Sequence, residues 1–259
     1  MIGREELGIY AKRRGVDPFL IENDYLQHIA LICMYEQFSN ELVFKGGTAL
    51  QKVYGLERLS RDLDFNLLSG DPDAKIERVA KRIGDYYPTS ITGPKKIKRG
   101  VGYRMHIEGP SFGSTGMRHI LPITFNKEEG ILLKPDFKSI NPGMIYEDPD
   151  LHTYSLLVMN IKEMMAEKVR ALATRKEVKP RDLYDLWFLL SNGYVLDMSL
   201  VRKKIEYDHA VFSLGKLEER IREIGPLWNS DLKPLTKNLP EYGVAANLLL
   251  NELRTGAKG

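Results

Sequence analysis

Two aspartates, Asp62 and Asp64, are separated by one residue in the segment Arg61–Leu67, which alternates polar and apolar side chains. Such alternation predicts a β-strand, in which residues two apart point to one face with Cα atoms about 6.5 Å apart. Two carboxylates at that spacing can share metal ions, because paired Mg²⁺ sites lie about 3.5–4 Å apart. The pair is therefore a candidate metal site for phosphoryl or nucleotidyl transfer.

A glycine-containing turn precedes the aspartates in the sequence. Glu41–Phe44 predicts a short strand, and Thr48–Tyr54 predicts a two-turn helix. The residues between them are Lys45, Gly46 and Gly47. Glycines at this place let the backbone approach a ligand closely, and the free N–H groups at a helix N-terminus favour a phosphate. A triphosphate held by the turn and a metal held by the aspartates would meet in the same cleft.

Each half of this pattern also has an ordinary structural interpretation. A Gly-Gly pair before a helix is more often a simple turn, and Asp-x-Asp on an alternating strand is more often a solvated face. The order of the two halves and their short separation favour the functional interpretation.

The rest of the pattern predicts an α+β protein with two parts, residues 1–150 and 151–259. The first part is expected to be a mixed β-sheet flanked by helices, and the second to be helical. Helices are predicted at Arg4–Arg14, Phe19–Gln37, from Asp71 to about Tyr87, Ile161–Arg175 and Arg181–Leu190. Further strands are predicted at Tyr103–Glu108, Ile120–Phe125 and Ile131–Phe137, with a loop over Pro88–Gly102.

Bulk properties narrow the class of protein only slightly. The 259 residues carry a formal net charge of +3 and one cysteine, Cys33, which excludes an intrachain disulfide and a cysteine-built zinc site. No apolar stretch approaches the roughly 18 residues of a membrane span, so a cytoplasmic protein is expected. The basic cluster Lys95–Arg99 could contact an RNA backbone or could serve solubility alone.

Several segments resemble a known family. They are Phe44–Leu50, Val53–Leu56 and Arg58–Phe65, with Ile21–Tyr25 upstream and Glu167–Leu172 and Arg181–Trp187 downstream. Together they resemble the AbiEii/AbiGii abortive-infection toxin nucleotidyltransferases, which belong to the DNA polymerase β-like nucleotidyltransferase superfamily. The resemblance covers about Ile21 to Leu190.

The resemblance implies an enzyme that transfers a nucleoside monophosphate from an NTP to a hydroxyl group and releases pyrophosphate. It implies Mg²⁺, or Mn²⁺ in its place, and a nucleotidyltransferase-type sheet followed by a helical domain that completes the nucleotide cleft. RNA, in particular tRNA, is the expected acceptor, and the enzyme is expected to be the toxin of a toxin–antitoxin pair. A cognate antitoxin is implied, but direct contact with it is not.

The resemblance also assigns roles to matching residues. The expected metal ligands are Asp62, Asp64 and, as a third carboxylate on a neighbouring strand, Asp136. Lys168 is expected to neutralise phosphate charge and to be catalytic together with these aspartates. The expected nucleotide-binding residues are Lys45, Gly46, Gly47, Thr48, Ser60, Lys168, Asp182 and Asp185, the last two as alternatives for the larger supporting role.

Two other functions remain open from the sequence. The acceptor could be a protein or a small molecule instead of RNA. The chain could also be a catalytically silent module that binds a nucleotide or a partner. The presence of Asp62, Asp64, Ser60 and Lys168 favours an active enzyme, because a silent member would be expected to lack at least one of them.

Overall fold

The computed structural model describes residues 1–127, 130–149 and 151–257. It divides the chain into two compact units. The first comprises Met1–Gly55, Leu59–Ile131 and Pro135–Val158, and the second Leu56–Arg58, Leu132–Lys134 and Met159–Gly259. Within the described ranges no helix is long and apolar enough to cross a membrane.

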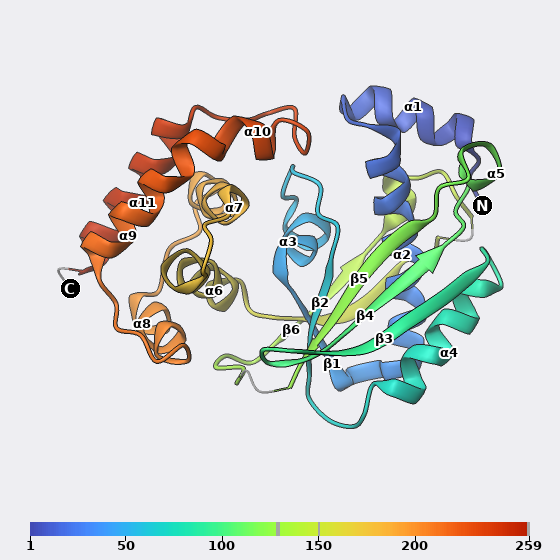
Figure 1. Ribbon diagram of the computed structural model, residues 1–259, viewed down its shortest axis with the longest axis horizontal. Helices are drawn as coiled ribbons and strands as arrows, with labels where there is room; N and C mark the ends of the chain where they lie inside the picture. Colours follow the sequence, from blue (N-terminus) through green and yellow to red (C-terminus); the bar gives the residue numbers. More distant parts are fainter. Residues whose placement is uncertain (128–129, 150, 258–259) are drawn as a thin grey trace. The chain divides into compact units, whose positions relative to one another are not determined.

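The first unit is built on one mixed sheet with the strand order β3-β4-β5-β2-β1-β7-β6 (Figure 1). Its strands are β1 (Leu42–Lys45), β2 (Leu63–Leu67), β3 (Thr89–Ile97), β4 (Gly100–Ile107), β5 (His119–Asn126), β6 (Asp136–Ile140) and β7 (Tyr154–Val158). The pairs β2/β5 and β1/β7 are parallel, and the other neighbours are antiparallel. The expected α+β class with a mixed sheet is confirmed.

Helices of the first unit cover this sheet. They are α1 (Arg4–Arg14), α2 (Pro18–Phe38), α3 (Gly46–Tyr54), α4 (Asp73–Gly84) and the short α5 (Phe112–Thr115), with 3-10 turns at Ser39–Glu41 and Pro142–Met144. The helix predicted at Phe19–Gln37 corresponds to α2, which begins at Pro18 because the Asp17 side chain accepts a hydrogen bond from the Phe19 amide at 2.8 Å. Figure 1 shows α2 running along one face of the strands with α4 beside it.

The register of the central strands explains why one face of the sheet is apolar. Phe44 on β1 pairs with Phe65 on β2, and Phe65 pairs with Phe125 on β5, so the three rings stack at centroid distances of 5.3 and 5.8 Å. Phe38 of α2 stacks on Phe125 at 5.5 Å. Because side chains alternate along a strand, Asp64 lies on the opposite face from Phe65. The buried core therefore fixes the face to which the aspartate points.

The second unit is helical. Its elements are α6 (Ile161–Thr174), α7 (Pro180–Ser191), α8 (Met198–Glu206), α9 (Leu214–Ile224), the 3-10 turn Gly225–Leu227, α10 (Trp228–Leu232) and α11 (Tyr242–Ala257). The predicted helices at Ile161–Arg175 and Arg181–Leu190 correspond to α6 and α7. The strand β7, which no sequence pattern predicted, follows residue 150 and belongs to the sheet of the first unit.

Two predictions about strands are wrong. The segment Pro88–Gly102 is not a loop, since it contains β3 and the start of β4. β3 is an edge strand that exposes most of its side chains, so it lacks the apolar alternation of a half-buried strand, and its Gly93–Pro94 pair lies at an irregularity of the ladder. The strand expected at Ile131–Phe137 begins only at Asp136, directly after Pro135, which has no N–H to donate to a ladder.

Candidate active site

The end of β1 and the start of α3 bring the backbone against Asp64. Lys45, the last residue of β1, is buried and lies opposite Asp64 in the ladder. Gly46 follows with φ +78°, and a Cβ atom at this position would lie 2.5 Å from Asp64 Oδ2. Only glycine leaves room for this approach and adopts this φ without strain. The carboxylate of Asp64 therefore lies against the N-terminus of α3.

The first turn of α3 is suited to bind an anion. It contains Gly46, Gly47 and Thr48, whose amide groups have no acceptor within the helix. The helix dipole adds a partial positive charge at this end. The expected position of a phosphate-binding turn is thus adjacent to the expected position of a metal-binding carboxylate.

Asp64 is held by a residue that the sequence did not indicate. Thr124 on β5 lies opposite Asp64 in the parallel ladder, and its Oγ1 donates a hydrogen bond to Asp64 Oδ1 at 2.6 Å. One carboxylate oxygen is therefore oriented by Thr124 while the other faces Gly46. No sequence signal links Thr124 to Asp64, because the two residues are 60 positions apart and meet only through strand pairing.

Asp62 lies one residue before β2, whereas the sequence predicted it within the strand. Its side chain is partly exposed, and its backbone oxygen accepts a hydrogen bond from Thr48 Oγ1 at 2.5 Å. Thr48 is fully buried. The hydroxyl of Thr48 therefore supports the segment that carries Asp62, while the Thr48 amide lies in the first turn of α3.

Ser60 is half-buried, and its backbone amide and carbonyl both form hydrogen bonds with glutamine side chains. Its amide donates to Gln51 Oε1 at 2.8 Å, and its carbonyl accepts from Gln27 Nε2 at 2.9 Å. The segment Ser60–Asp62 thus enters β2 with its backbone held at several points.

The prediction that Asp136 lies on a strand next to the aspartate strand is wrong. Asp136 begins β6, and β1 and β7 stand between β6 and β2. Three strand spacings of about 4.8 Å separate the two strands. The strand on the other side of β2 is β5, where Thr124 occupies the position opposite Asp64. The described residues hold no group of three or more His, Cys, Asp or Glu side chains that could bind a metal ion.

The remaining predicted residues form a charged network in the second unit. Lys168 Nζ lies 3.0 Å from Asp182 Oδ1 and 2.6 Å from Asp185 Oδ2. Both aspartates are fully buried. Asp185 also accepts two hydrogen bonds of 2.6 Å from the buried guanidinium of Arg58, and Arg175 donates to Asp182 at 2.5 Å. The carboxylates of both aspartates are therefore engaged with cationic side chains of the same unit.

The electrostatics of this network follow from burial and pairing. Burial alone would raise the pKa of Asp182, but attraction by Lys168 and Arg175 outweighs it and lowers the pKa below its usual range. Burial alone would lower the pKa of Arg58, but attraction by the Asp185 carboxylate outweighs this effect. The pKa of Arg58 is therefore raised above its ordinary value. The side chains of Asp182 and Arg58 are therefore charged at neutral pH.

A pH-dependent stability follows from Asp182. Its pKa in the folded protein lies below the ordinary value of 3.8, so the unfolded chain takes up the proton first as the pH falls. The stabilisation is complete above pH 3.8 and is lost as the pH falls through the folded pKa. Asp182→Asn should therefore lower the free energy of unfolding at pH 7 by about 3 kcal/mol, because Arg175 loses a carboxylate partner and Lys168 keeps only Asp185.

Urea unfolding at a series of pH values checks this expectation. The Asp182→Asn variant should lose less stability than the wild type between pH 4 and pH 2. The exposed Asp231→Asn serves as the control and should behave as the wild type. If the free energy of unfolding of the Asp182→Asn variant and of the wild type fell equally between pH 4 and pH 2, Asp182 would not titrate as described.

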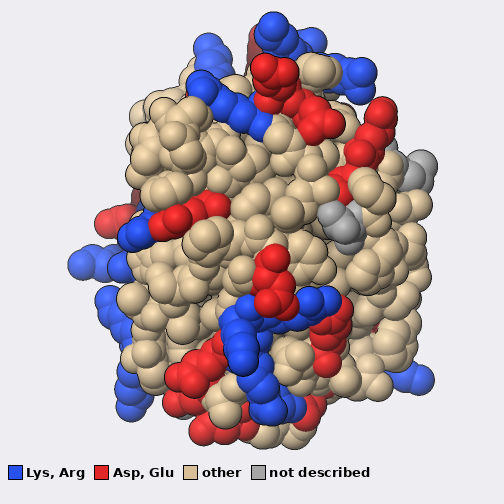
Figure 2. Space-filling view, turned by 90° about the vertical axis from the view of Figure 1, so that its right-hand side faces the viewer, with Lys and Arg blue, Asp and Glu red and all other residues tan. Residues whose placement is uncertain are grey.

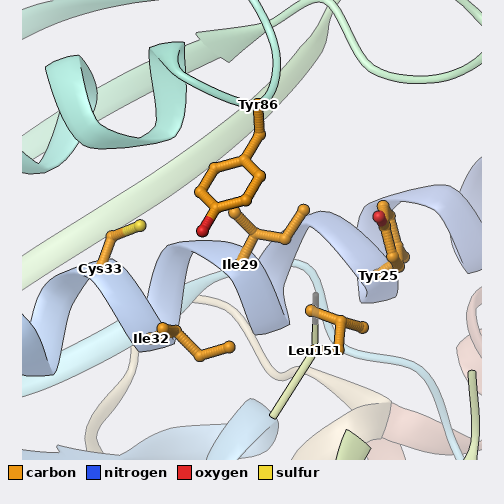
Figure 3. Close-up of a pocket in the computed structure, with 6 residues that line it drawn as sticks. All are labelled: Tyr25, Ile29, Ile32, Cys33, Tyr86 and Leu151. Atoms are coloured by element: carbon orange, nitrogen blue, oxygen red, sulfur yellow. The ribbon is translucent and has the colours of Figure 1, made fainter. Parts of the chain in front are cut away.

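A pocket in the first unit has a different character from the turn beside Asp64. It is lined by Tyr25, Ile29, Ile32 and Cys33 of α2 together with Tyr86 and Leu151 (Figure 3). None of these six side chains is charged at neutral pH, so they offer nothing that would offset the charge of a triphosphate. Burial raises the pKa of the Cys33 thiol to about 12, which makes this cysteine an unreactive core residue.

Known proteins share this architecture. The structure is similar to that of MenT4, a nucleotidyltransferase toxin from Mycobacterium tuberculosis H37Rv, with a TM-score of 0.68 at 19% identity over 100% of this chain and 94% of that chain. It is also similar to JHP933 from Helicobacter pylori, with a TM-score of 0.55 at 19% identity over 92% of this chain and 93% of that chain. These likenesses establish the fold. A search of curated proteins found no significant match.

The sequence itself matches a family model. Residues 31–248 match the model of the nucleotidyl transferase AbiEii toxin of type IV toxin–antitoxin systems. The match spans the glycine turn, the aspartate pair and the Lys168 network, and it covers most of the chain. The chain is therefore a nucleotidyltransferase that belongs to the AbiEii toxin family.

Proposed function

We propose that this enzyme transfers a nucleoside monophosphate from an NTP to a hydroxyl group of RNA, and that the transfer depends on a divalent metal ion held by Asp62 and Asp64. The observation that carries the proposal is the contact between Gly46 and Asp64. This contact places the N-terminus of α3, with its free amide groups, next to the Asp64 carboxylate. Position 46 has no room for a side chain, because a Cβ atom there would lie 2.5 Å from Asp64 Oδ2. A phosphate and a cation placed there would be adjacent, as nucleotidyl transfer requires.

The donor set fits Mg²⁺, with Mn²⁺ as the alternative. Carboxylate oxygens are ligands that Mg²⁺ prefers, and Mg²⁺ is commonly held by one or two protein carboxylates together with substrate phosphates. The pair Asp62 and Asp64 supplies such a set. When bound, the metal ion neutralises charge on the attacking and the leaving oxygen. Asp136 is not part of this set.

The chain's own groups position the reactants. The first-turn amides of α3 bind phosphate oxygens, and Lys45 lies buried opposite Asp64 on the same face of the sheet. Thr124 orients one oxygen of Asp64, so the carboxylate does not have to reorganise during the reaction. Lys168 is proposed to neutralise nucleotide phosphate, with its ammonium group oriented by Asp182 and Asp185.

The family and one surface feature support RNA as the acceptor. Lys95, Lys96 and Lys98 are exposed in the hairpin of β3 and β4, where a polyanion could bind. Lysines on an edge strand also prevent strand-to-strand aggregation, so they do not by themselves require RNA. Figure 2 shows acidic and basic side chains side by side on the face that it draws. Protein and small-molecule acceptors therefore remain outcomes of the test.

The acceptor is tested with ATP, GTP, CTP and UTP, each labelled at the α-phosphate and incubated separately with the enzyme, Mg²⁺ and total cellular RNA. The proposal predicts a labelled band that ribonuclease removes and protease does not. A protease-sensitive label would make protein the acceptor. Binding of NTP without label on RNA or protein would leave a small-molecule acceptor or a silent nucleotide-binding module.

A further inference from the structure

Three side chains from two helices hold the backbone directly before β2. Gln51 Oε1 of α3 accepts a hydrogen bond from the Ser60 amide at 2.8 Å, and Gln27 Nε2 of α2 donates one to the Ser60 carbonyl at 2.9 Å. Thr48 of α3 donates to the Asp62 carbonyl at 2.5 Å. The backbone of the segment Ser60–Asp62, which contains two predicted site residues, is thus fixed from outside the strand.

The two glutamines are oriented by neighbouring residues of α2. Asp24 Oδ1 accepts a hydrogen bond from Gln51 Nε2 at 2.5 Å, and Asn23 Oδ1 accepts from Gln27 Nε2 at 3.1 Å. Because Asp24 is an acceptor, the amide nitrogen of Gln51 must face it, and the amide oxygen must face Ser60. Asp24 therefore sets which group Gln51 presents to the Ser60 amide.

Asp24 is itself firmly anchored. Its side chain is 2% exposed, Lys52 Nζ lies 2.9 Å from its Oδ1, and the Tyr146 hydroxyl donates to its Oδ2 at 2.7 Å. Burial alone would raise the pKa of Asp24, but the attraction of Lys52 outweighs it, and the pKa is lowered. A hydrogen bond to a charged acceptor is about twice as strong as one between neutral groups, so the Gln51 amide is held rigidly.

We propose that Asp24 acts through Gln51 as a positioning residue that holds the Ser60–Asp62 segment in place for the nucleotide and the metal ion. The inference rests on the proposed function, because it assumes that Ser60 binds the triphosphate. Neither Asp24 nor Gln51 touches the reacting atoms in this scheme. Their effect reaches the site through one chain of hydrogen bonds, from the Asp24 carboxylate to the Gln51 amide and on to the Ser60 amide.

The first variant is Gln51→Met, which keeps the length of the side chain and removes both of its hydrogen bonds. The Ser60 amide then loses its acceptor, and only the bonds from Gln27 and Thr48 still hold the segment. The KM for the NTP should rise about tenfold, while the change in kcat should be smaller. Hydrogen exchange at the Ser60 amide, measured by NMR without NTP, should become faster in the same variant.

A matched control removes a different hydrogen bond to the same carboxylate. Tyr146→Phe deletes the hydroxyl that contacts Asp24 Oδ2 but leaves the path from Oδ1 to Gln51 intact. A general loosening of α2 would affect both variants equally. The positioning role predicts that Tyr146→Phe keeps the KM and the Ser60 exchange rate of the wild type.

A compensating pair tests the direction of the hydrogen bonds. Gln51→Glu alone places two carboxylates together and should raise the KM. Asp24→Asn should also raise the KM, because it replaces the charged acceptor of the Gln51 amide with a neutral one. In the double variant the new amide at position 24 donates a hydrogen bond to the new carboxylate at position 51. That carboxylate in turn accepts a hydrogen bond from the Ser60 amide. The path is then restored with the same total charge. The KM of the double variant should lie closer to the wild type than that of either single variant.

The outcomes separate this inference from the proposed function. A wild-type KM in Gln51→Met, or an equal rise in Tyr146→Phe, overturns the positioning role. If the wild type transfers no nucleotide at all, the proposed function fails. In that case an unchanged Ser60 exchange rate in Gln51→Met also overturns the role of Gln51, and a faster one supports it.

Discussion

Asp62→Ala is expected to abolish nucleotidyl transfer while the protein remains folded. The substitution removes one of two proposed metal-binding carboxylates, and such an interaction is worth several kcal/mol of transition-state stabilisation. Because each 1.36 kcal/mol corresponds to about tenfold in rate, the rate should fall by at least about 100-fold. The contact from Thr48 goes to the backbone oxygen of residue 62, which alanine retains.

The comparison variant for Asp62→Ala is Glu77→Ala, which removes an exposed carboxylate from α4 in the same unit. Its transfer rate should equal that of the wild type. Thermal unfolding of both variants verifies the fold, and a transfer assay with α-labelled NTP gives the rate. Normal transfer by a folded Asp62→Ala protein would falsify the assignment of the metal site.

Gly46→Ala is expected to have the second large effect. An added Cβ would lie 2.5 Å from Asp64 Oδ2, and the φ of +78° is unfavourable for alanine. The carboxylate must move away or the turn must open, and either change separates the phosphate-binding amides from the metal ligand. Because a displacement of about 1 Å can cost on the order of 100-fold in rate, the transfer rate should fall by about that factor.

Gly55→Ala is a control that isolates the steric contact from backbone strain. Gly55 ends the same helix with φ +72°, yet a Cβ there would meet nothing within 4 Å. Both variants should therefore lose a similar stability of about 1–2 kcal/mol from the left-handed backbone. Only Gly46→Ala should also lose transfer, and equal transfer rates in the two variants would show that the contact with Asp64 has no catalytic role.

The parts of the site that the sequence could predict are local in the chain. The turn at Lys45–Gly47 and the Asp62–Asp64 pair each depend on a few adjacent residues, whose strand and helix signals are clear. The helices α2, α6 and α7 were predictable for the same reason, because their periodicity and caps lie within them. The short separation along the chain also allowed the two halves of the site to be connected from the sequence alone.

The residues that support the site could not be predicted, because they meet it only through tertiary contacts. Thr124 reaches Asp64 through strand pairing, and Gln51 and Gln27 reach Ser60 from two helices. Asp136 is a residue that the sequence placed at the site but that lies on a distant strand. A carboxylate on a later strand was expected beside the pair, but the strand order places β6 at the far edge of the sheet. Strand order depends on the whole fold and is not encoded in any one segment.

The burial of the charged network around Lys168 could not be predicted from the sequence either. The alternation of Lys, Arg and Glu along α6 is typical of a solvated helix face, but Asp182 and Asp185 of α7 are fully buried and pair with Lys168, Arg58 and Arg175. Burial of an ion pair is costly unless each charge is paired and hydrogen-bonded. Sequence patterns alone do not reveal whether those partners are in place.

Nucleotidyl transfer breaks the bond between the α- and β-phosphates of the NTP. It is tested most directly by incubating the wild-type enzyme and Mg²⁺ with total cellular RNA and NTP labelled at either the α- or the γ-phosphate. We expect only the α-label to become covalently attached to the acceptor, with one pyrophosphate released per nucleotide transferred, and we expect EDTA to abolish both. Attachment of the γ-label, or transfer that is unaffected by EDTA, would contradict it.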